Sequence, residues 1–371
     1  MIIIPVCHAN YINMKRVDKV VPVYSRSEID KAGDILRDEK QEKEWAFKVL
    51  NNWRASHSYP INTFQAYLRS KIRENKFKKT IVVQRIKRVP SIIGKLNRIQ
   101  TMKLSRMHDI GGLRAILKTQ KQIYTLVNSF RKARFRHELV KTYDYIEEPK
   151  NSGYRGIHLV YKYNNRQAPE FNNLRIEVQL RTFLQHAWAT AVETMGIFLD
   201  HSLKASEGPK EWLEFFSMVG SAFAYLEDSS PAKKYSNTDP RDLVKKIIEV
   251  EKKLSVKNSL LAFGSSIEVI TSQKIKLKYY IIHLKPAENK IIFQGYHAKD
   301  FEKATNDYLS TEKSLGDQRD EQVVLVSGDS FIALKNAYPN YFLDTHEFNS
   351  YLDTLERKFS PVRRYERKAT G

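Results

Sequence analysis

Apolar residues recur at helical spacing through the first part of the chain. Between residues 27 and 54 they stand mostly three or four positions apart among acids and bases. They are Ile29, Ala32, Ile35, Leu36, Trp45, Ala46, Val49 and Leu50. Such spacing gathers them on one helix face, so it predicts one or two amphipathic helices. Comparable patterns predict a helix over 64–77 and another that begins at Pro90.

The pattern changes in the middle of the chain. The segments 113–117, 156–161 and 174–180 are short, apolar and partly alternating, which is typical of strands. Helical patterns over 120–133 and 183–195 separate or follow them. The sequence therefore predicts an α+β fold with a mixed β-sheet flanked by helices.

Residues 227–242 are poor in large aliphatic side chains and rich in Ser, Pro, Asp and Lys, which is typical of a linker. Beyond it the patterns predict a helix over 242–254, strands over 279–284 and 290–296, a helix over 300–309 and a strand over 322–326. We therefore predict two domains, 1–226 and 243–371. The second is a small α+β domain with a disordered basic tail after Lys358.

Composition adds a preference for anionic partners. The chain has 371 residues, of which 42% are hydrophobic and 11% aromatic, as expected of a folded protein of about two domains. Its 63 Lys and Arg against 42 Asp and Glu give a net charge of +21, which favours nucleic acids or nucleotides. From Arg69 to Arg106 the only acid is Glu74. We expect this stretch to face phosphate, although a solvated helix face would look the same.

Cysteine usage and hydropathy exclude several classes of protein. Cys7 is the only cysteine, so the chain has no intrachain disulfide and no cysteine-rich zinc site. No apolar run approaches the length of a membrane span, and the first residues lack the charges of a secretory signal. We expect a cytoplasmic protein without membrane contacts.

Four segments carry candidate chemistry, and the first is RIKRVPSIIGK, residues 85–95. Its basic side chains precede a predicted helix. Lysines supply compact charges, arginines supply planar forks, and a helix start adds free backbone donors, so the layout suits a triphosphate. A basic surface helix is the alternative.

Two carboxylates stand near predicted strands. Asp109 lies in HDIGGLR, at a Gly-Gly turn before a strand, and Glu177 lies within a later strand. Mg²⁺ takes one or two carboxylates and completes its shell with water and phosphate oxygens, so the pair suits this ion. Alternatively, Asp109 is a turn residue and Glu177 points to solvent.

The last two segments suit a nucleotide acceptor. In KNSGYRGIH, residues 150–158, Tyr154 stands between two glycines and can stack on a base, although a hairpin turn would have the same composition. In IEVQLRTFLQHAWA, residues 176–189, strand alternation places Glu177, Gln179 and Arg181 on one face.

Taken in order, these four segments resemble the consecutive motifs of the RelA/SpoT synthetase domain. The resemblance covers about residues 81–193 and, with flanking helices, extends the domain to about residue 226. It implies a nucleotidyltransferase-like mixed sheet and transfer of the β,γ-pyrophosphate of ATP to a 3′-hydroxyl. No HD dipeptide precedes His108, so the resemblance is to short members that only synthesise.

The resemblance also implies residue roles. For ATP the residues are Arg85, Lys87, Ser91, Lys95 and Arg114. For Mg²⁺ and catalysis they are Asp109 and Glu177, with Tyr154 as a third catalytic residue that stacks on the acceptor's base. For the acceptor they are Lys150, Tyr154, Arg155, His158, Gln179 and Arg181.

The family contains members with different acceptors. Alarmone synthetases use GDP, GTP or adenine nucleotides, whereas toxic members modify the 3′-terminal adenosine of tRNA and block translation. The net charge of +21 favours tRNA, because an acceptor stem needs basic surface beyond a nucleotide pocket. We expect tRNA pyrophosphorylation. A small alarmone synthetase and a non-catalytic RNA-binding regulator are the alternatives.

The C-terminal part is similar to that of the fused toxin-antitoxin proteins called CapRel. That similarity implies a pseudo-zinc-finger-like regulatory domain that inhibits the enzyme through Tyr338 and Tyr341. It further implies release by a phage capsid protein, and thus a role in anti-phage defence. Aromatic packing at a helix end is the alternative for the two tyrosines. The sequence leaves the oligomeric state open, and we favour a monomer.

Overall fold

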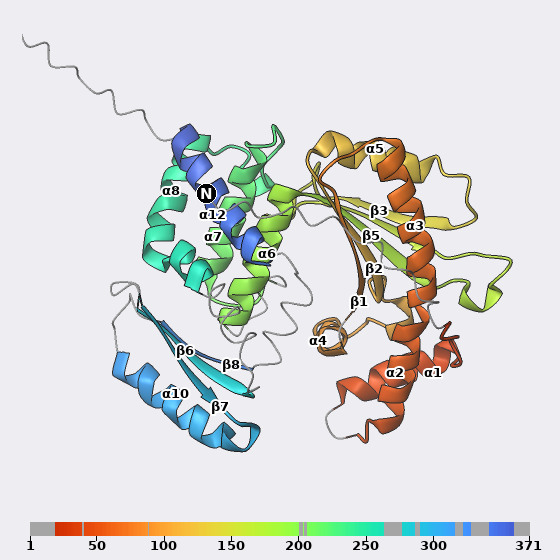
Figure 1. The fold of residues 1–371 in the computed structure, drawn as a ribbon, viewed down its shortest axis with the longest axis horizontal. Helices are drawn as coiled ribbons and strands as arrows, with labels where there is room; N and C mark the ends of the chain where they lie inside the picture. Colours follow the sequence, from red (N-terminus) through yellow and green to blue (C-terminus); the bar gives the residue numbers. More distant parts are fainter. Residues whose placement is uncertain are drawn as a thin grey trace, which may run out of the picture.

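The computed structural model describes residues 19–38, 41–87, 89–199, 203, 206–262, 277–285, 290–315, 322–327 and 341–359. Figure 1 shows two groups of elements. One is a five-stranded sheet with the N-terminal helices, and the other is a helical bundle beside a three-stranded sheet. Among the described residues, no helix has both the length and the apolar character needed to cross a membrane.

Three helices precede the first sheet, α1 (Arg26–Arg37), α2 (Glu44–Ser56) and α3 (Ser58–Glu74). A capping box starts α1, because the Ser25 side chain accepts from the Glu28 N–H while Glu28 accepts from the Ser25 N–H. The predicted helices before residue 54 are thus confirmed as two. The third begins earlier than predicted, with Pro60 in its first turn, where a missing N–H costs little.

The central sheet consists of β1 (Ile81–Ile86), β2 (Gly111–Leu117), β3 (Glu138–Asp144), β4 (Ile157–Lys162) and β5 (Arg175–Thr182). Its order is β1-β2-β5-β4-β3. The β2–β5 pair is parallel, and the other pairs are antiparallel. The predicted mixed sheet is therefore confirmed, and β5 lies at its centre.

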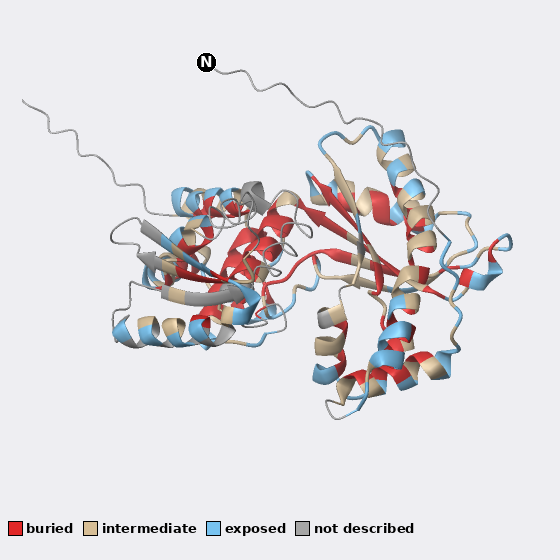
Figure 2. Cartoon of the chain, turned by 60° about the horizontal axis from the view of Figure 1, so that its bottom comes forward, coloured by how far each residue is buried: buried red, intermediate tan, exposed pale blue. Residues whose placement is uncertain are grey.

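Helices α3 and α5 (Gln120–Arg131) pack against the central sheet, whereas α4 (Val89–Arg98) packs on α1. Short 3₁₀ turns occur at Leu104–Arg106 and Pro169–Phe171. The buried side chains of these elements form one continuous core. Figure 2 shows this core as the red part of the sheet and its helices.

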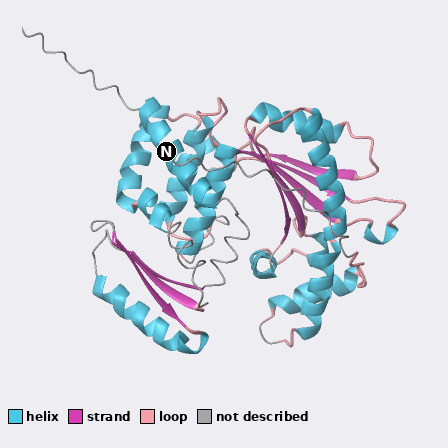
Figure 3. Cartoon of the chain, in the orientation of Figure 1, coloured by secondary structure: helices cyan, strands magenta, loops and turns pink. Residues whose placement is uncertain are grey.

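A helical bundle follows the sheet, made of α6 (Phe183–Phe198), α7 (Lys210–Ala224), α8 (Pro240–Leu254) and α12 (Tyr341–Phe359). Helix α8 packs on α7, and α12 packs on α6, α7 and α8 (Figure 3). The last helix therefore completes a core that begins in the first predicted domain.

The segment predicted as a linker, 227–242, makes several contacts with the helices around it. Ala232 is fully buried, Tyr235 donates a hydrogen bond to Glu214, and Glu227 accepts hydrogen bonds from Gln120 and Gln185. A 3₁₀ turn covers Lys233–Tyr235. Of the segment, only Ala232 and Tyr235 are buried, whereas most of the small and polar residues are exposed. The division into domains at this segment stays a prediction.

The second sheet consists of β6 (Tyr279–Lys285), β7 (Lys290–Tyr296) and β8 (Gln322–Ser327), in the order β7-β6-β8. A 3₁₀ turn at Ala298–Asp300 precedes α10 (Phe301–Leu315), which packs on β6 and β8. The strands and the helix that the sequence predicted here are confirmed. Tyr338 and the tail after residue 359 lie outside the described residues, as does the side chain of Tyr341.

Candidate active site

One face of the central sheet gathers the predicted chemical side chains. Directly paired residues of neighbouring strands share a face, as do residues two apart in one strand. Gln179 of β5 pairs with Arg114 of β2 on one side and with His158 of β4 on the other. Glu177 and Arg181 flank Gln179 on the same face. The register thus brings three of the four predicted motifs together.

The carboxylate of Asp109 binds two lysines from the first motif. Lys87 Nζ donates to Asp109 Oδ2 at 2.6 Å, and Lys95 Nζ donates to Oδ1 at 2.9 Å. Burial alone would raise the pKa of Asp109, but the two ammonium groups hold it well below its usual range. Asp109 is therefore ionised at neutral pH. The first motif is joined to the second by these bonds.

Glu177 is almost enclosed, and both of its carboxylate oxygens accept hydrogen bonds. His158 Nδ1 lies 2.7 Å from Oε1, and Gln179 Nε2 donates to Oε2 at 2.8 Å. Burial opposes ionisation, but His158 and the Gln179 amide lower the pKa of Glu177 to about 2. The negative charge of Asp109 raises the pKa of Glu177, so the two carboxylates are near enough to interact.

The hydroxyl of Tyr154 closes a ring of hydrogen bonds. It lies 2.5 Å from His158 Nε2 and accepts from Arg181 Nη2 at 2.8 Å. Arg181 also donates to Gln179 Oε1 at 3.3 Å, and Gln179 in turn binds Glu177. Burial would raise the pKa of Tyr154, but Arg181 and His158 lower it to about 7. Five predicted site residues thus bind one another.

Two predicted acceptor contacts are enclosed instead of open. Only 8% of Tyr154 is exposed; its ring centre lies 6.2 Å from that of Trp188 and 5.4 Å from the ammonium of Lys150. Its stacking on a base stays a prediction. Only 3% of Arg155 is exposed, and it donates to the carbonyl oxygens of Ser230 and Ile146. The segment around residue 230 encloses Arg155 in this structure, and the contact of Arg155 with the acceptor stays a prediction.

The remaining predicted residues lie at the edges of this face. Arg85 pairs with Gly112 through its backbone, while its side chain lies outside the described part of the chain. Ser91 is half-buried in α4, and Arg114 is buried in β2. Lys150 is exposed, with its ammonium 4.4 Å from the ring centre of Tyr145. Their roles toward ATP or an acceptor stay predictions.

Asp109 and Glu177 form a donor set that suits Mg²⁺. Both side chains are ionised carboxylates with limited exposure, 25% and 11%. The described residues contain no group of three or more His, Cys, Asp or Glu that could hold a metal ion. Two carboxylates nevertheless meet the usual need of Mg²⁺, which takes its other ligands from water and phosphate.

Sequence reasoning missed two aromatic residues beside this network. Tyr143 pairs directly with His158, and the Tyr145 ring stands edge-on to the His158 ring at 5.4 Å. His108 was also missed, and its pKa is lowered by burial and then by Arg175 and Lys95. The spacing Tyr143-Asp144-Tyr145 before the glycine loop was the available signal. That spacing places Tyr143 beside His158 only through the β3–β4 register, which no local pattern specifies.

Comparison with known proteins identifies this part of the chain. Residues 84–197 match the model described as the region found in RelA / SpoT proteins. The match spans the four motifs, so their predicted resemblance to RelA/SpoT proteins is confirmed over these residues. The likeness of residues 243–371 to CapRel proteins stays a prediction.

Two curated relatives match about a third of the chain. GTP pyrophosphokinase YwaC of Bacillus subtilis (strain 168) is 34% identical over 114 residues, which is 29% of this chain and 52% of YwaC. GTP pyrophosphokinase YjbM of the same strain is 35% identical over 124 residues, which is 33% of this chain and 54% of YjbM. The chain thus spans about half the length of these curated relatives.

The matches to solved structures cover more of both chains. Small alarmone synthetase 1 from Bacillus subtilis bound to its product pppGpp has 25% identity and a TM-score of 0.40. The match covers 46% of this chain and 89% of that one. A GTP pyrophosphokinase family protein from Streptococcus pneumoniae has 21% identity and a TM-score of 0.39, over 46% of this chain and 85% of that one.

Proposed function

We propose that this chain is an ATP-dependent pyrophosphokinase that transfers the β,γ-pyrophosphate of ATP to a 3′-hydroxyl. The observation that carries the proposal is that two ionised carboxylates, Asp109 and Glu177, lie near enough to interact, and that two lysines bind Asp109. Phosphoryl transfer asks for positioning and charge stabilisation more than for covalent chemistry, and this set supplies both. The match of residues 84–197 to RelA / SpoT proteins supports the same reaction class.

ATP is proposed to bind on the β1 and β2 side of β5. Lys87 and Lys95 now neutralise Asp109, and they are within reach of phosphates that bind beside it. Arg85, Ser91 and Arg114 complete this side, with the two arginines for the adenine. When bound, Mg²⁺ at Asp109 and Glu177 would neutralise charge on the transferred phosphates.

The acceptor is proposed to bind on the β4 side. Its 3′-oxygen forms a bond to the β-phosphorus of ATP as the bond between that phosphorus and the α-phosphate oxygen breaks, so AMP leaves. Glu177 takes the hydroxyl proton. His158 and Gln179 hold the two oxygens of Glu177, and thereby fix the direction from which it can accept that proton.

A guanine nucleotide is the acceptor that we favour. The two curated relatives are both named GTP pyrophosphokinases, and one solved relative carries pppGpp as its product. On this proposal the chain makes an alarmone from ATP and GDP or GTP.

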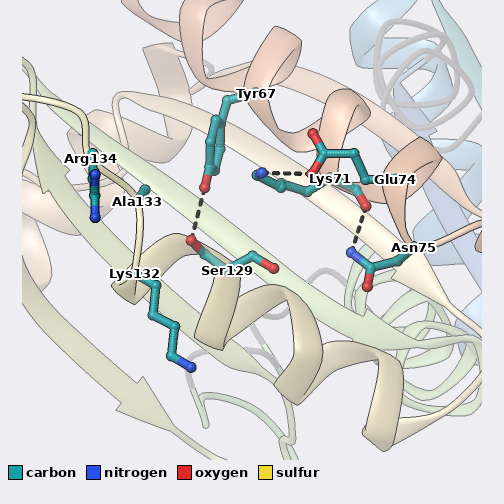
Figure 4. A pocket seen from close by; sticks show the side chains of 8 residues that line it. All are labelled: Tyr67, Lys71, Glu74, Asn75, Ser129, Lys132, Ala133 and Arg134. Carbon is teal, nitrogen blue, oxygen red and sulfur yellow. Dashed lines mark hydrogen bonds and ion pairs between the residues drawn. The ribbon is translucent and has the colours of Figure 1, made fainter.

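The 3′ end of tRNA is a second candidate, favoured by one surface. Exposed cations gather at the ends of α3 and α5 and before β3. They are Arg69, Arg73, Lys76, Lys78, Lys79, Arg131, Lys132, Arg134 and Arg136. A pocket of about 470 Å³ lies among them, between α3 and α5. In Figure 4, Lys132 and Arg134 stand opposite Tyr67 and Lys71. Such a surface suits a phosphate backbone.

Regulation by the C-terminal part also stays a proposal. Inhibition through Tyr338 and Tyr341, and release by a phage capsid protein, would make the chain a switchable toxin. Removing residues after about 230 is a poor test of this idea, because α8 and α12 belong to the same core as α6 and α7. Replacing Tyr338 and Tyr341 together by Ala in the full chain tests it without removing that core.

Transfer assays test the proposed activity. The full chain is incubated with Mg²⁺, ATP labelled in its γ-phosphate, and GDP, GTP or deacylated tRNA. We expect label to enter GDP or GTP, and Asp109→Asn to abolish transfer while leaving the fold intact by circular dichroism. Label that enters tRNA but neither guanine nucleotide would select the second candidate. Absence of transfer to every acceptor would refute the activity.

A charge-reversal experiment tests the tRNA surface separately. Lys132, Arg134 and Arg136 are changed together to Glu, and the matched control changes Lys245, Lys246 and Lys252 on the exposed side of α8. If tRNA is the acceptor, the first variant alone should lose tRNA affinity and show a shallower dependence of binding on salt. Equal binding by both variants would remove this surface from the proposal.

A further inference from the structure

The main chain of Lys87 is held from two sides. Its N–H donates to the Ile110 carbonyl at 2.8 Å, and its own carbonyl oxygen accepts from Arg54 Nε of α2, also at 2.8 Å. Arg54 is half-buried and lies 33 residues before Lys87 in the sequence. A lysine side chain is a flexible stem with a charge at its tip, so these two bonds fix the point from which that stem starts.

A second arginine holds the chain just after α4. Arg37 of α1 donates from Nη1 to the Gln100 carbonyl at 2.9 Å and from Nη2 to the Met102 carbonyl. The planar fork of an arginine suits two neighbouring acceptors of this kind. On both flanks of α4, an arginine from an N-terminal helix therefore binds main-chain carbonyl oxygens.

The same face of α1 holds the residues that follow. Asp34 Oδ2 accepts from Lys103 Nζ at 2.8 Å, and Asp30 Oδ1 accepts from the Ser105 N–H at 2.9 Å. Asp30, Asp34 and Arg37 stand four and three positions apart, so they lie on one side of the helix. The contact between α1 and the segment after α4 is thus a row of polar bonds.

Close packing accompanies these bonds. A Cβ at Gly33 would lie 2.8 Å from Leu104 Cβ, so α1 approaches this turn as closely as a glycine permits. Ile92 and Leu96 of α4 have no exposed surface, and α4 packs on α1. Lys95, one position before Leu96, stays partly exposed. The position of α1 therefore determines where α4 presents Lys95.

The spacing between β1 and α4 matters for the site. Lys87 follows β1 and Lys95 stands in α4, yet both reach Asp109, at 2.6 and 2.9 Å. A shift of α4 relative to β1 would separate the two ammonium groups. A misplacement of about 1 Å in an active site can lower the rate about a hundredfold, so the contacts that set this spacing affect function.

We propose that Arg54 and Arg37 are positioning residues for ATP, which hold Lys87 and Lys95 at the spacing that the phosphates need by binding carbonyls on either side of α4. The proposal rests on the proposed function, because it takes the two lysines as ATP residues. Neither arginine is assigned a contact with ATP itself. Helices α1 and α2 thereby act on the donor side of the reaction and not on the acceptor side.

Two replacements of Arg54 separate its hydrogen bond from its charge. In glutamine, Nε2 is bonded to Cδ as Nε is in arginine, so Arg54→Gln can donate to the Lys87 carbonyl from the same place. Arg54→Met keeps a long side chain without a donor. Arg37→Met tests the other flank. The matched control is Lys48→Met, which removes an exposed cation from the same helix as Arg54.

The first measurement is ATP KM, acceptor KM and kcat in the full chain, with GDP and with deacylated tRNA. Arg54→Met and Arg37→Met are each expected to raise ATP KM about three- to tenfold, while acceptor KM changes by less than about twofold. Arg54→Gln and Lys48→Met should keep the natural ATP KM. An unchanged ATP KM in both Met variants, or an equal rise in Arg54→Gln or in acceptor KM, would overturn the proposal.

Equilibrium dialysis separates this result from the activity itself. The probe is a labelled ATP analogue with a methylene group between the α- and β-phosphorus, where the bond would break, together with Mg²⁺ and no acceptor. Weaker binding by Arg54→Met and Arg37→Met, with natural binding by Arg54→Gln, would support the proposal even if no transfer occurs, in which case only the proposed reaction fails.

Two other outcomes of the dialysis count against the proposal. Equal binding by all variants, together with transfer by the natural protein, would refute the positioning role and leave the reaction standing. A natural chain that does not bind the analogue at all would overturn the proposed ATP side, and the positioning role with it.

Discussion

Tyr154 shows how one hydroxyl can organise several charged groups. It lies against His158 Nε2 and accepts from Arg181, a side chain that is only 2% exposed. His158 in turn holds Glu177. The hydroxyl therefore positions Glu177 through His158, a role that differs from stacking on a base.

Tyr154→Phe distinguishes these two roles, because it keeps the ring and removes the hydroxyl. A hydrogen bond to a charged group contributes about 1.5–3 kcal/mol, so we expect kcat to fall about ten- to hundredfold with little change in acceptor KM. The assay uses labelled ATP. Tyr67→Phe is the control, since that hydroxyl donates to the Ser129 carbonyl between α3 and α5. Wild-type kcat in Tyr154→Phe would instead assign the residue's role to its ring.

His57 provides a pH test that is independent of the site. It is fully buried beside the Trp53 carbonyl, and burial lowers its pKa to about 4. Below the ordinary pKa of 6.5 the unfolded chain binds the proton and the folded chain does not. The resulting stability is therefore complete above pH 6.5 and is lost as pH falls toward 4.

The expected loss is on the order of 3 kcal/mol in the free energy of unfolding. His57→Gln should remove that pH dependence, so its difference from the natural protein should shrink between pH 7.5 and 4.5. Urea unfolding at both pH values measures this. A constant difference between the two proteins would show that His57 does not titrate as described.

At the scale of elements, the conformation of the glycine loop, in the motif over residues 150–158, depends on its contact with α7. Gly153 has a φ of +88°, which favours glycine, and its backbone packs directly on Gly220. A Cβ at Gly220 would lie 2.7 Å from Gly153 Cα and 2.8 Å from its carbonyl carbon. The loop must move if this helix position gains a side chain.

Gly220→Ala should therefore disturb Tyr154 and Lys150 without changing either residue. We expect a loss of about 1–3 kcal/mol in unfolding free energy, as for overpacked cores, together with a lower kcat. Urea unfolding and the transfer assay report the two effects. Gly94→Ala in α4 is the control, because a Cβ there meets no atom within 4 Å and should slightly stabilise the helix. Equal behaviour of the two variants would contradict the contact.

Local patterns predicted most elements but not how they meet. Alternation predicted β2, β4 and β5, because buried and polar positions repeat every second residue within one strand. The β3–β4 register and the closure over Arg155 depend on partners about ten to 75 residues away. The motifs therefore named Asp109, Glu177, Lys87 and Lys95, whereas the hydrogen-bonded ring and the two arginines beside α4 needed the fold.

At the scale of the molecule, the core of the bundle joins distant parts of the sequence. Phe348 of α12 is fully buried, with its ring 6.1 Å from Phe216 and 5.6 Å from Phe223 of α7. This cluster therefore draws side chains from both predicted domains, 1–226 and 243–371, and their division stays a prediction. The second sheet adds Tyr280 and Ile282 to the same cluster.

Phe348→Ala should destabilise the bundle by about 3–5 kcal/mol, as deletion of a buried phenyl group usually does. Tryptophan fluorescence during urea unfolding measures the loss, since Trp188 and Trp212 lie in the same cluster. Ser350→Ala, at an exposed position of α12, is the control. An effect of Phe348→Ala no larger than that of the control would show that α12 contributes little to this core.

The return of α12 onto α6 also sets an order of events during synthesis. The last strand of the central sheet ends at Thr182, and α12 ends at Phe359. At about 5–20 residues per second, a ribosome needs roughly ten to thirty seconds to make the chain between these points. During that interval the sheet can fold with Asp109 and Glu177 in place, while the apolar side of α7 is not yet covered by Phe348. A nascent chain therefore passes through a stage in which its site precedes its full core, and chaperone binding at α7 would be timed to that stage.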